Sequence, residues 1–293
     1  MKYLEKHPML MVVVGILGIS LSSIFIKYST APSAVTAAFR LLWTILLMTP
    51  VVLGKAEVRA ELGKLDKRSA LLSGLSGIFL AIHFLLWFES LRHTSVASAA
   101  TLVCTEVIWV SIGFCLFQGG HIPTKAVFAI SLALAGSVLI AWVDSGSGFH
   151  LYGDLLALMA SVAAAVYMLI GRVVQRKVST TVYTYIVYAA CAAVLVAVCL
   201  AGNLRLWAYG MRPVIIGALL AVFSTILGHS IFSWCLKFFS PSFVSAAKLC
   251  EPVVASILAA FLFGEVPTLM QLAGGALILG GLYSYSRIEN GKE

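Results

Sequence analysis

The feature that most constrains the fold is a series of long apolar segments along the whole chain. Each is about 20 residues long, the length that a helix needs to cross a hydrocarbon core about 30 Å thick. Hydrophobic residues make up 61% of the sequence and charged residues only 11%, against roughly a quarter charged in ordinary soluble domains. Barrel strands are shorter, about ten residues, and alternate in character. The sequence therefore predicts an all-α integral membrane protein. Its ten expected spans are residues 9–29, 34–53, 69–91, 95–117, 125–143, 152–174, 181–201, 212–235, 243–263 and 267–286.

The basic residues indicate the orientation of these spans. When the N-terminus is placed in the cytoplasm, fourteen of the twenty lysines and arginines fall on the cytoplasmic side. This bias follows the positive-inside rule, so we expect an inner-membrane protein with both termini cytoplasmic and with lipid around it. The same distribution accounts for the net charge of +8 without nucleic acid as a partner. Four basic residues fall on the opposite side: Lys27, Arg92, Arg205 and Arg212.

An internal repeat divides the chain into two halves. A shift of 145 residues aligns the first five spans with the last five and matches Glu106 with Glu251 and Gly136 with Gly281. We expect repeats at residues 1–145 and 146–293, each with five helices. Because five is an odd number, the two repeats lie in the membrane with opposite orientations, an arrangement typical of secondary transporters. The alternative is a duplicated membrane scaffold with no transport role.

Four stretches carry a family resemblance. They are SLRHTSVASAATL before Glu106, FSPSFVSAAKLCEPVVASILAAFLFGE through Glu265, AAFRLLWTILL in the second span and GGALILGG in the tenth. Over essentially the whole chain they resemble the EamA-type members of the drug/metabolite transporter superfamily. The first repeat departs from the pattern, with Val107 in place of the proline at Pro252 and Gly120 where Glu265 would align. The resemblance implies two inverted five-helix bundles around a central cavity, and members that move amino acids, nucleoside-like metabolites or drugs, often outward.

Charged residues within the spans are candidates for solute binding, because ionisable groups are costly in a membrane. Glu106 has no basic neighbour on its own helix, so it needs a proton, a partner on another helix or a substrate. Lys248 and Glu251 lie three residues apart and can neutralise each other as an internal brace. Lys248 aligns with Val103 in the first repeat, so it makes the half-sites unequal. A carboxylate at Lys248 and an amine at Glu106 would suit a zwitterionic solute.

Aromatic residues extend the predicted substrate site. His83 and Trp87 share one helical face, Trp109 lies one turn from Glu106, and His229 lies one place from the position symmetric to His83. The alternatives are a histidine hydrogen-bonded to a backbone carbonyl and a tryptophan that only packs. We expect the third, fourth, eighth and ninth spans to line the cavity. Two further ionisable residues have other expected roles: Arg40, a structural residue that snorkels outward, and Glu89, near a cavity entrance.

No enzymatic or cofactor motif competes with transport. The sequence has no GxGxxG opening a helix, phosphate-binding loop, HExxH or GxSxG motif. Its six cysteines have neither CxxC nor metal-ligand spacing. We therefore expect a cofactor-free secondary transporter that exports an amino acid or amine-like metabolite by alternating access. A proton-coupled drug-cation antiporter is the alternative, followed by a membrane-embedded enzyme and a non-transporting scaffold.

Overall fold

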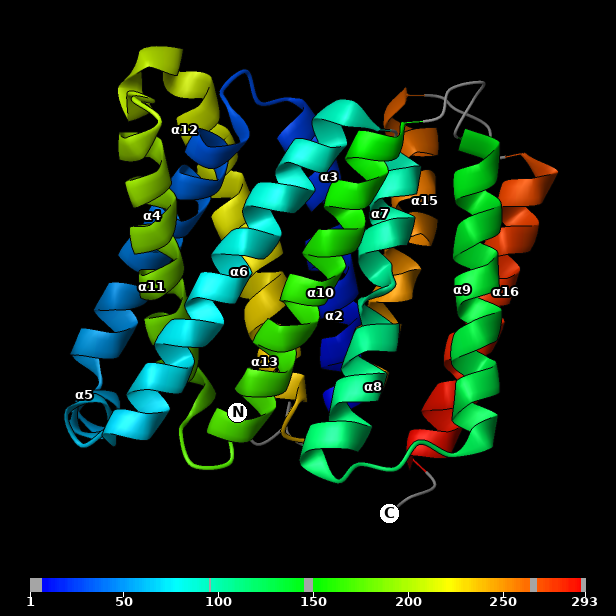
Figure 1. The fold of residues 1–293 in the computed structure, drawn as a ribbon, viewed down its shortest axis with the longest axis horizontal. Helices are drawn as coiled ribbons and strands as arrows, with labels where there is room; N and C mark the ends of the chain where they lie inside the picture. Colours follow the sequence, from blue (N-terminus) through cyan, green and yellow to red (C-terminus); the bar gives the residue numbers. More distant parts are fainter. Residues whose placement is uncertain (1–6, 95, 145–149, 264–267, 291–293) are drawn as a thin grey trace.

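The computed structural model describes residues 7–94, 96–144, 150–263 and 268–290, and every regular element within them is a helix (Figure 1). The helices run up and down through one bundle and are joined by short connections. Their bounds in the first half are α2 (Pro8–Ser20), α3 (Ser22–Lys27), α4 (Ser33–Gly54), α5 (Ala56–Gly63), α6 (Lys67–His93), α7 (Val96–Cys104), α8 (Glu106–Gln118) and α9 (Thr124–Asp144). Those in the second half are α10 (Leu151–Val174), α11 (Thr180–Ala201), η1 (Leu206–Tyr209), α12 (Met211–Leu219), η2 (Leu220–Ser230), α13 (Ile231–Cys235), α14 (Pro241–Ala247), η3 (Lys248–Cys250), α15 (Glu251–Phe263) and α16 (Leu269–Asn290).

Eight helical segments of the described chain are long and apolar enough to cross a membrane. They correspond to the first eight predicted spans, which makes this a multi-pass membrane protein. The ninth and tenth predicted spans are not among the eight. The ninth is divided into α14, η3 and α15, and its Gly264–Glu265 dipeptide lies outside the described residues. The tenth corresponds to α16, whose apolar residues are interspersed with Gln271, Ser284 and Ser286.

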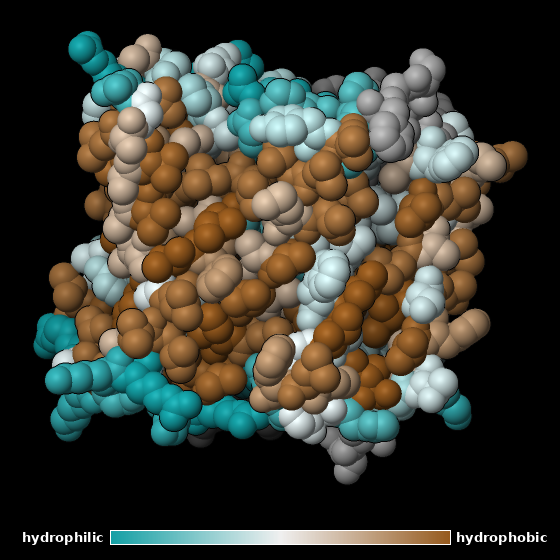
Figure 2. All heavy atoms as spheres, in the orientation of Figure 1, coloured by the Kyte–Doolittle hydropathy of each residue, from teal (hydrophilic) through white to brown (hydrophobic). Residues whose placement is uncertain are grey.

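The molecular surface agrees with a membrane setting. A broad hydrophobic band crosses the face shown in Figure 2, and hydrophilic residues gather at the two ends of the bundle. Large apolar side chains such as Leu46, Phe128 and Trp142 are exposed. A contiguous apolar surface of this size is typical of a protein surrounded by lipid.

Small residues allow some helices to approach very closely. A Cβ atom added at Gly281 of α16 would lie 2.6 Å from the carbonyl oxygen of Ala129 in α9, and one added at Gly274 would lie 2.7 Å from that of Gly136. Real side chains do not approach a backbone so closely. The α9–α16 pair, at the edge of the bundle in Figure 1, therefore packs backbone against backbone, as helices do in membranes where apolar surfaces alone give little driving force.

Polar contacts join the connections to the helices at both ends of the bundle. α6 ends at the upper end of the bundle in Figure 1. There the Ser33 hydroxyl, at the start of α4, donates to Glu89 at 2.7 Å, and the Thr94 hydroxyl, just after α6, donates to Asp154 at 2.8 Å. At the lower end, backbone N–H groups donate to glutamates. The backbone nitrogen of Ser179 lies 2.5 Å from Glu61 Oε1, and the backbone nitrogen of Ser240 lies 2.6 Å from Glu289 Oε1. Both serines are also N-caps, of α11 and α14 respectively.

Candidate functional site

Two helices are interrupted halfway, and each second half begins with a glutamate. Thr105 separates α7 from α8, so Glu106 is the first residue of α8. The 3-10 turn η3 separates α14 from α15, so Glu251 is the first residue of α15. The first turn of a helix carries partial positive charge from its free N–H groups, which favours a carboxylate there. Discontinuous helices of this kind form the substrate sites of many secondary transporters.

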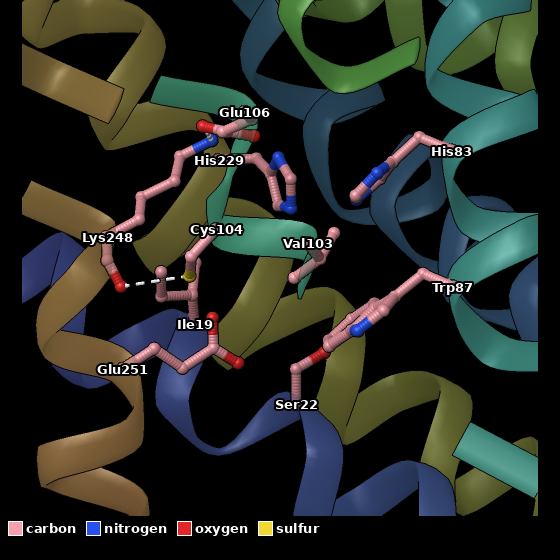
Figure 3. A pocket seen from close by; sticks show the side chains of 10 residues that line it. All are labelled: Ile19, Ser22, His83, Trp87, Val103, Cys104, Glu106, His229, Lys248 and Glu251. Atoms are coloured by element: carbon pink, nitrogen blue, oxygen red, sulfur yellow. Dashed lines mark hydrogen bonds and ion pairs between the residues drawn. The ribbon is translucent and has the colours of Figure 1, made fainter. Parts of the chain in front are cut away.

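Both glutamates line one pocket in the middle of the bundle (Figure 3). Its cavity volume is about 30 Å³. The walls combine six polar or charged side chains and a tryptophan with small apolar and sulfur-containing ones. The lining residues are Ile19, Ser22, His83, Trp87, Val103, Cys104, Glu106, His229, Lys248 and Glu251. The four predicted helices contribute to this lining, and the first span adds two residues that sequence reasoning missed, Ile19 and Ser22.

Lys248 forms an ion pair with Glu106, not with Glu251. Its Nζ lies 2.7 Å from Glu106 Oε1, and both side chains are buried. Glu106 thus has a partner on another helix, one of the three possibilities that its sequence left open. No ion pair joins Lys248 to Glu251 within the described residues, so the internal brace expected from their spacing is absent there. A solute carboxylate at Lys248 and an amine at Glu106 would have to displace this ion pair, so that arrangement stays a prediction.

Glu251 and Trp87 each place a polar atom in the pocket wall without a protein partner. Glu251 is 5% exposed and its Oε1 is buried with no hydrogen bond. Trp87 is 4% exposed and its indole Nε1 is likewise buried and unbonded. Buried polar groups are normally hydrogen-bonded, and the exceptions often mark functional sites. In Figure 3, these two side chains lie on either side of Ser22, away from the Lys248–Glu106 pair.

The two histidines lie close together on the wall formed by α6 and η2. Their ring centroids are 6.2 Å apart, and His83 stacks on Trp87 with ring planes 15° apart. His83 Nδ1 lies 3.0 Å from the carbonyl oxygen of Ala160. Because a carbonyl only accepts, Nδ1 carries the proton of the neutral ring and leaves Nε2 as an acceptor. The backbone contact expected of a structural histidine is therefore present in a residue that also lines the pocket.

Trp109, the remaining predicted substrate-binding residue, lies outside the lining of this pocket. Its Nε1 donates to Ser161 at 3.0 Å, and its side chain is 37% exposed. Trp109 lies one turn after Glu106 on α8. Its ring, however, contacts α10 and is partly exposed at the surface, so it does not reach the pocket. The structure thus brings six of the seven predicted residues together: His83, Trp87, Glu106, His229, Lys248 and Glu251.

Arg40 is the residue whose position differs most from expectation. It is fully buried, so the outward snorkelling predicted for it is wrong. Its Nε donates to Thr225 at 2.8 Å, and its guanidinium lies 4.1 Å from the centroid of the Phe84 ring. Nη1 reaches the pocket residue Ser22 at 3.4 Å, while Nη2 is buried without a partner. Thr225 belongs to η2, a π-helical segment, and such segments often occur at functional sites.

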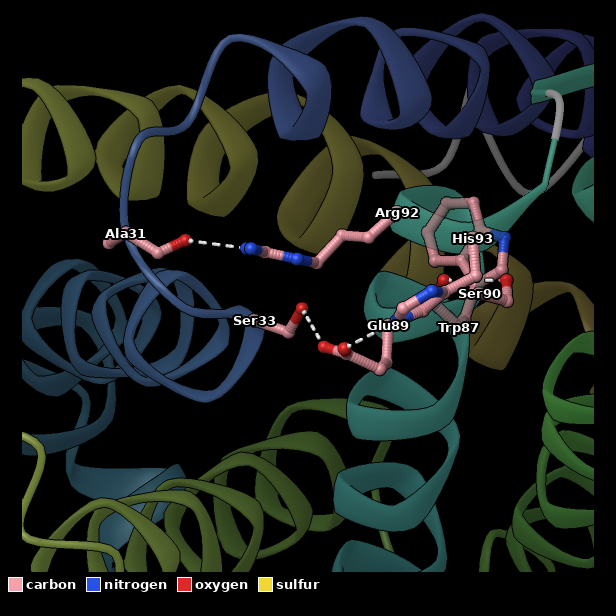
Figure 4. A network of polar contacts seen from close by, with 7 residues as sticks. All are labelled: Ala31, Ser33, Trp87, Glu89, Ser90, Arg92 and His93. Carbon is pink, nitrogen blue, oxygen red and sulfur yellow. Dashed lines mark hydrogen bonds and ion pairs between the residues drawn. The ribbon is translucent and has the colours of Figure 1, made fainter. Parts of the chain in front are cut away.

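Glu89 lies beyond the pocket, at the end of α6 (Figure 4). It accepts from Ser33 and lies 3.1 Å from His93 Nε2, and its side chain is 38% exposed. Arg92 donates from the same helix end to the carbonyl oxygen of Ala31 at 3.4 Å. These contacts hold the start of α4 against the end of α6, near the position where the sequence predicts a cavity entrance.

Comparison with known proteins identifies relatives of this architecture. The model described as the EamA-like transporter family matches residues 7–142 and again residues 151–287. An "Uncharacterized transporter" of Archaeoglobus fulgidus is 25% identical over 261 residues, 89% of each chain. The "Pseudopaline exporter CntI" of Pseudomonas aeruginosa (strain UCBPP-PA14) is 25% identical, over 73% of this chain and 74% of that protein. A "Probable amino-acid metabolite efflux pump" of Salmonella typhimurium is 28% identical, over 68% of this chain and 71% of that protein.

A solved structure has the same fold. It superposes with a TM-score of 0.79 and covers 98% of this chain and 99% of its own, at 18% sequence identity. Similarity at this level of identity shows the arrangement of the helices and nothing about the solute.

Proposed function

Because the chain belongs to the EamA-like transporter family, we propose that it is a secondary transporter that exports a small organic metabolite, an amino acid or amine-like solute, by alternating access. Membership makes it a membrane transporter. The mode of transport, the solute and the direction are the proposal. The observation that carries the proposal is the central pocket, which is lined by residues of the two interrupted helices. One of these residues, Glu251, has a buried carboxyl oxygen without a hydrogen-bond partner.

We further propose ten membrane spans arranged as two inverted repeats, at residues 1–145 and 146–293. The two separate family matches, to 7–142 and 151–287, support this division. The helix interruptions support it too, because they precede Glu106 and Glu251, which correspond at the 145-residue offset. The excess of basic residues on one side favours cytoplasmic termini and insertion in the inner membrane.

Alternating access requires the pocket to open toward one side at a time. With a volume of about 30 Å³ the cavity is much smaller than typical ligand sites, which measure roughly 300–1,000 Å³. A solute therefore enters only after helices separate at one end. The candidate closing contacts are Ser33 with Glu89 at the upper end and Ser179 with Glu61 at the lower end. Each is a single hydrogen bond, weak enough to break during a transport cycle.

The choice of solute rests on the pocket and on the relatives. A buried carboxylate whose neighbouring cation is already paired favours a cationic group such as an ammonium. Trp87 adds an aromatic ring of the kind that attracts cations. Two relatives named as an exporter and as an efflux pump motivate the outward direction and the amino-acid-like class.

Export of a drug cation in exchange for a proton is a second candidate. The observation that favours it is again Glu251, because a carboxyl without a partner can take up either a proton or a cation, but not both at once.

Solute counterflow in proteoliposomes tests the proposed function. Purified protein is reconstituted into vesicles preloaded with an unlabelled amino acid or amine, and uptake of the labelled solute is followed without ATP. We expect transient accumulation above that of protein-free vesicles for at least one solute. A pH gradient that drives uptake of hydrophobic cations, with no amino acid exchanged, would favour the antiporter. Absence of exchange for every solute under every gradient would contradict transport.

A further inference from the structure

The charges around the pocket leave one cation and one carboxylate uncompensated. Four residues with ionisable side chains are buried there, two basic and two acidic, so their formal charges cancel: Arg40, Glu106, Lys248 and Glu251. Lys248 and Glu106 form an ion pair. No ion pair joins Arg40 to Glu251 among the described residues, and each retains a buried polar atom without a partner, Nη2 and Oε1 respectively.

A buried guanidinium without a carboxylate is energetically costly, because neither water nor a counter-charge replaces its lost hydration. Arg40 is partly compensated by Thr225 and by the face of the Phe84 ring. Those contacts fix its orientation and leave its Nη1 against Ser22, a pocket residue. The positive charge therefore stands directly behind the pocket wall at Ser22.

Two further groups at this wall can donate hydrogen bonds to a solute. The Trp87 indole is a donor only, and its buried N–H has no acceptor. Ser22 accepts from Arg40, so its own hydroxyl hydrogen can point into the pocket. Figure 3 shows Ser22 extending toward the Trp87 ring, with the Glu251 carboxylate on its other side.

We propose that Ser22, Trp87 and Arg40 form an anion-binding corner that takes the carboxylate of the transported solute, while Glu251 takes its ammonium group. This inference rests on the proposed function and deepens it. Ser22 and Trp87 donate to the carboxylate oxygens, and Arg40 acts behind Ser22 as a fixed counter-charge. A monoanionic group fits because Arg40 is the one uncompensated cation beside the pocket among the described residues, whereas a dianionic phosphate would bring an excess charge into the bundle. The Lys248–Glu106 pair stays intact as the opposite wall.

Ligand-induced thermal stabilisation in detergent tests this assignment. Three matched panels with the same side chains are compared: free L-amino acids, their N-acetyl derivatives and their primary amides. We expect stabilisation by at least one free amino acid, and binding about tenfold weaker or worse for its amide and its N-acetyl derivative, since each has lost one charged group that the pocket would hydrogen-bond.

Variants then assign each end of the solute. Trp87→Phe and Ser22→Ala should weaken binding of the free amino acid but not of its amide, which no longer has a carboxylate to lose. Glu251→Gln should weaken binding of the free amino acid and of its amide, and should leave binding of the N-acetyl derivative unchanged. Arg40→Gln, which removes the counter-charge, should act like Trp87→Phe, whereas Arg40→Lys, which keeps the charge, should retain more of the binding. Trp43→Phe and Ser20→Ala are the matched controls, because their polar atoms bond to the backbone carbonyls of Val214 and Ile16, away from this corner.

The corner is refuted if amides stabilise the protein as well as free amino acids do, if Trp87→Phe weakens all three panels equally, or if no free amino acid binds. Counterflow separates this failure from failure of transport itself. Exchange of an organic cation without a carboxylate would overturn the corner and leave the transporter intact, whereas no exchange of any solute would overturn the proposed function.

Discussion

Lys248 Nζ lies 2.7 Å from Glu106 Oε1, and this contact joins the two halves of the chain at the pocket. Glu106 begins α8 in the first half, and Lys248 lies in the η3 interruption of the second. Two helix interruptions that face one another are thus tied by a buried ion pair. Breaking such a pair by removing one partner is costly, whereas removing both is tolerated much better.

The first prediction concerns the stability of this pair. Lys248→Met and Glu106→Gln should each destabilise the protein by about 3–5 kcal/mol, because each leaves one buried charge uncompensated. The double variant should be more stable than the sum of the two changes implies. The free energies of unfolding of the wild type, the two single variants and the double variant are measured by equilibrium unfolding in detergent. If the two effects simply add, the ion pair is not coupled in the folded protein.

The second prediction contrasts the two glutamates. Glu251→Gln should leave the unfolding temperature unchanged or raise it, because it replaces a buried carboxyl whose Oε1 has no partner by a neutral amide of the same shape. Glu106→Gln in the same detergent should lower it. A loss of stability in Glu251→Gln as large as that in Glu106→Gln would mean that Glu251 has a structural partner, and would remove the main reason for assigning it to the solute.

The third prediction uses adjacent glycines of α16. Gly281→Ala should destabilise the α9–α16 contact, because its Cβ would lie 2.6 Å from the carbonyl oxygen of Ala129. Gly280→Ala is the matched control, with no atom within 4 Å of its added Cβ. It should stabilise the helix by roughly 0.5–1 kcal/mol, since alanine loses less backbone entropy than glycine. Thermal unfolding of both variants checks the difference, and equal effects would contradict the close packing.

The fourth prediction concerns opening at one end. Ser33→Ala removes the hydrogen bond to Glu89, which contributes about 1 kcal/mol. The fraction of molecules whose pocket is open at that end should therefore rise about fivefold. Cys104 lines the pocket and reports this opening through its reaction with a membrane-impermeant maleimide in sealed vesicles. In Ser33→Ala, modification of Cys104, measured by mass spectrometry, should be faster than in wild type when the maleimide is added on the Ser33 side of the membrane. It should not be faster when the maleimide is added on the opposite side. Equal acceleration from both sides would argue against independent closing contacts.

Hydropathy predicted the first eight spans because burial of some 20 apolar residues dominates the placement of a membrane helix. The same signal could not locate the interruptions before Glu106 and Glu251. Both lie within continuous apolar segments, where backbone geometry is set by packing against other helices and not by local composition. Pro252 follows the second interruption, but proline is not a reliable signal for these interruptions, since Val107 occupies the corresponding place at the first.

The cost of charge in a membrane singled out the ionisable residues that line the pocket, but it did not predict how they pair. Helical spacing suggested Glu251 as the partner of Lys248, because spacing reports neighbours on one helix and nothing about other helices. Arg40 shows the same limit. Its depth in the second span was consistent with snorkelling, while the contact that turns it inward, to Thr225, lies 185 positions along the chain. Trp109 was placed near Glu106 along the helix, yet it faces α10.

The central claim is that the pocket around Glu251 is the solute site, and flux of an exchanged solute tests it most directly. Counterflow of that solute is compared in proteoliposomes of wild type, Glu251→Gln and Glu57→Gln, at equal amounts of folded protein. Glu57→Gln is the control because it makes the same change at an exposed position of α5, away from the pocket lining. We predict that Glu251→Gln abolishes exchange while Glu57→Gln retains it. Exchange by Glu251→Gln at the wild-type rate would contradict the account.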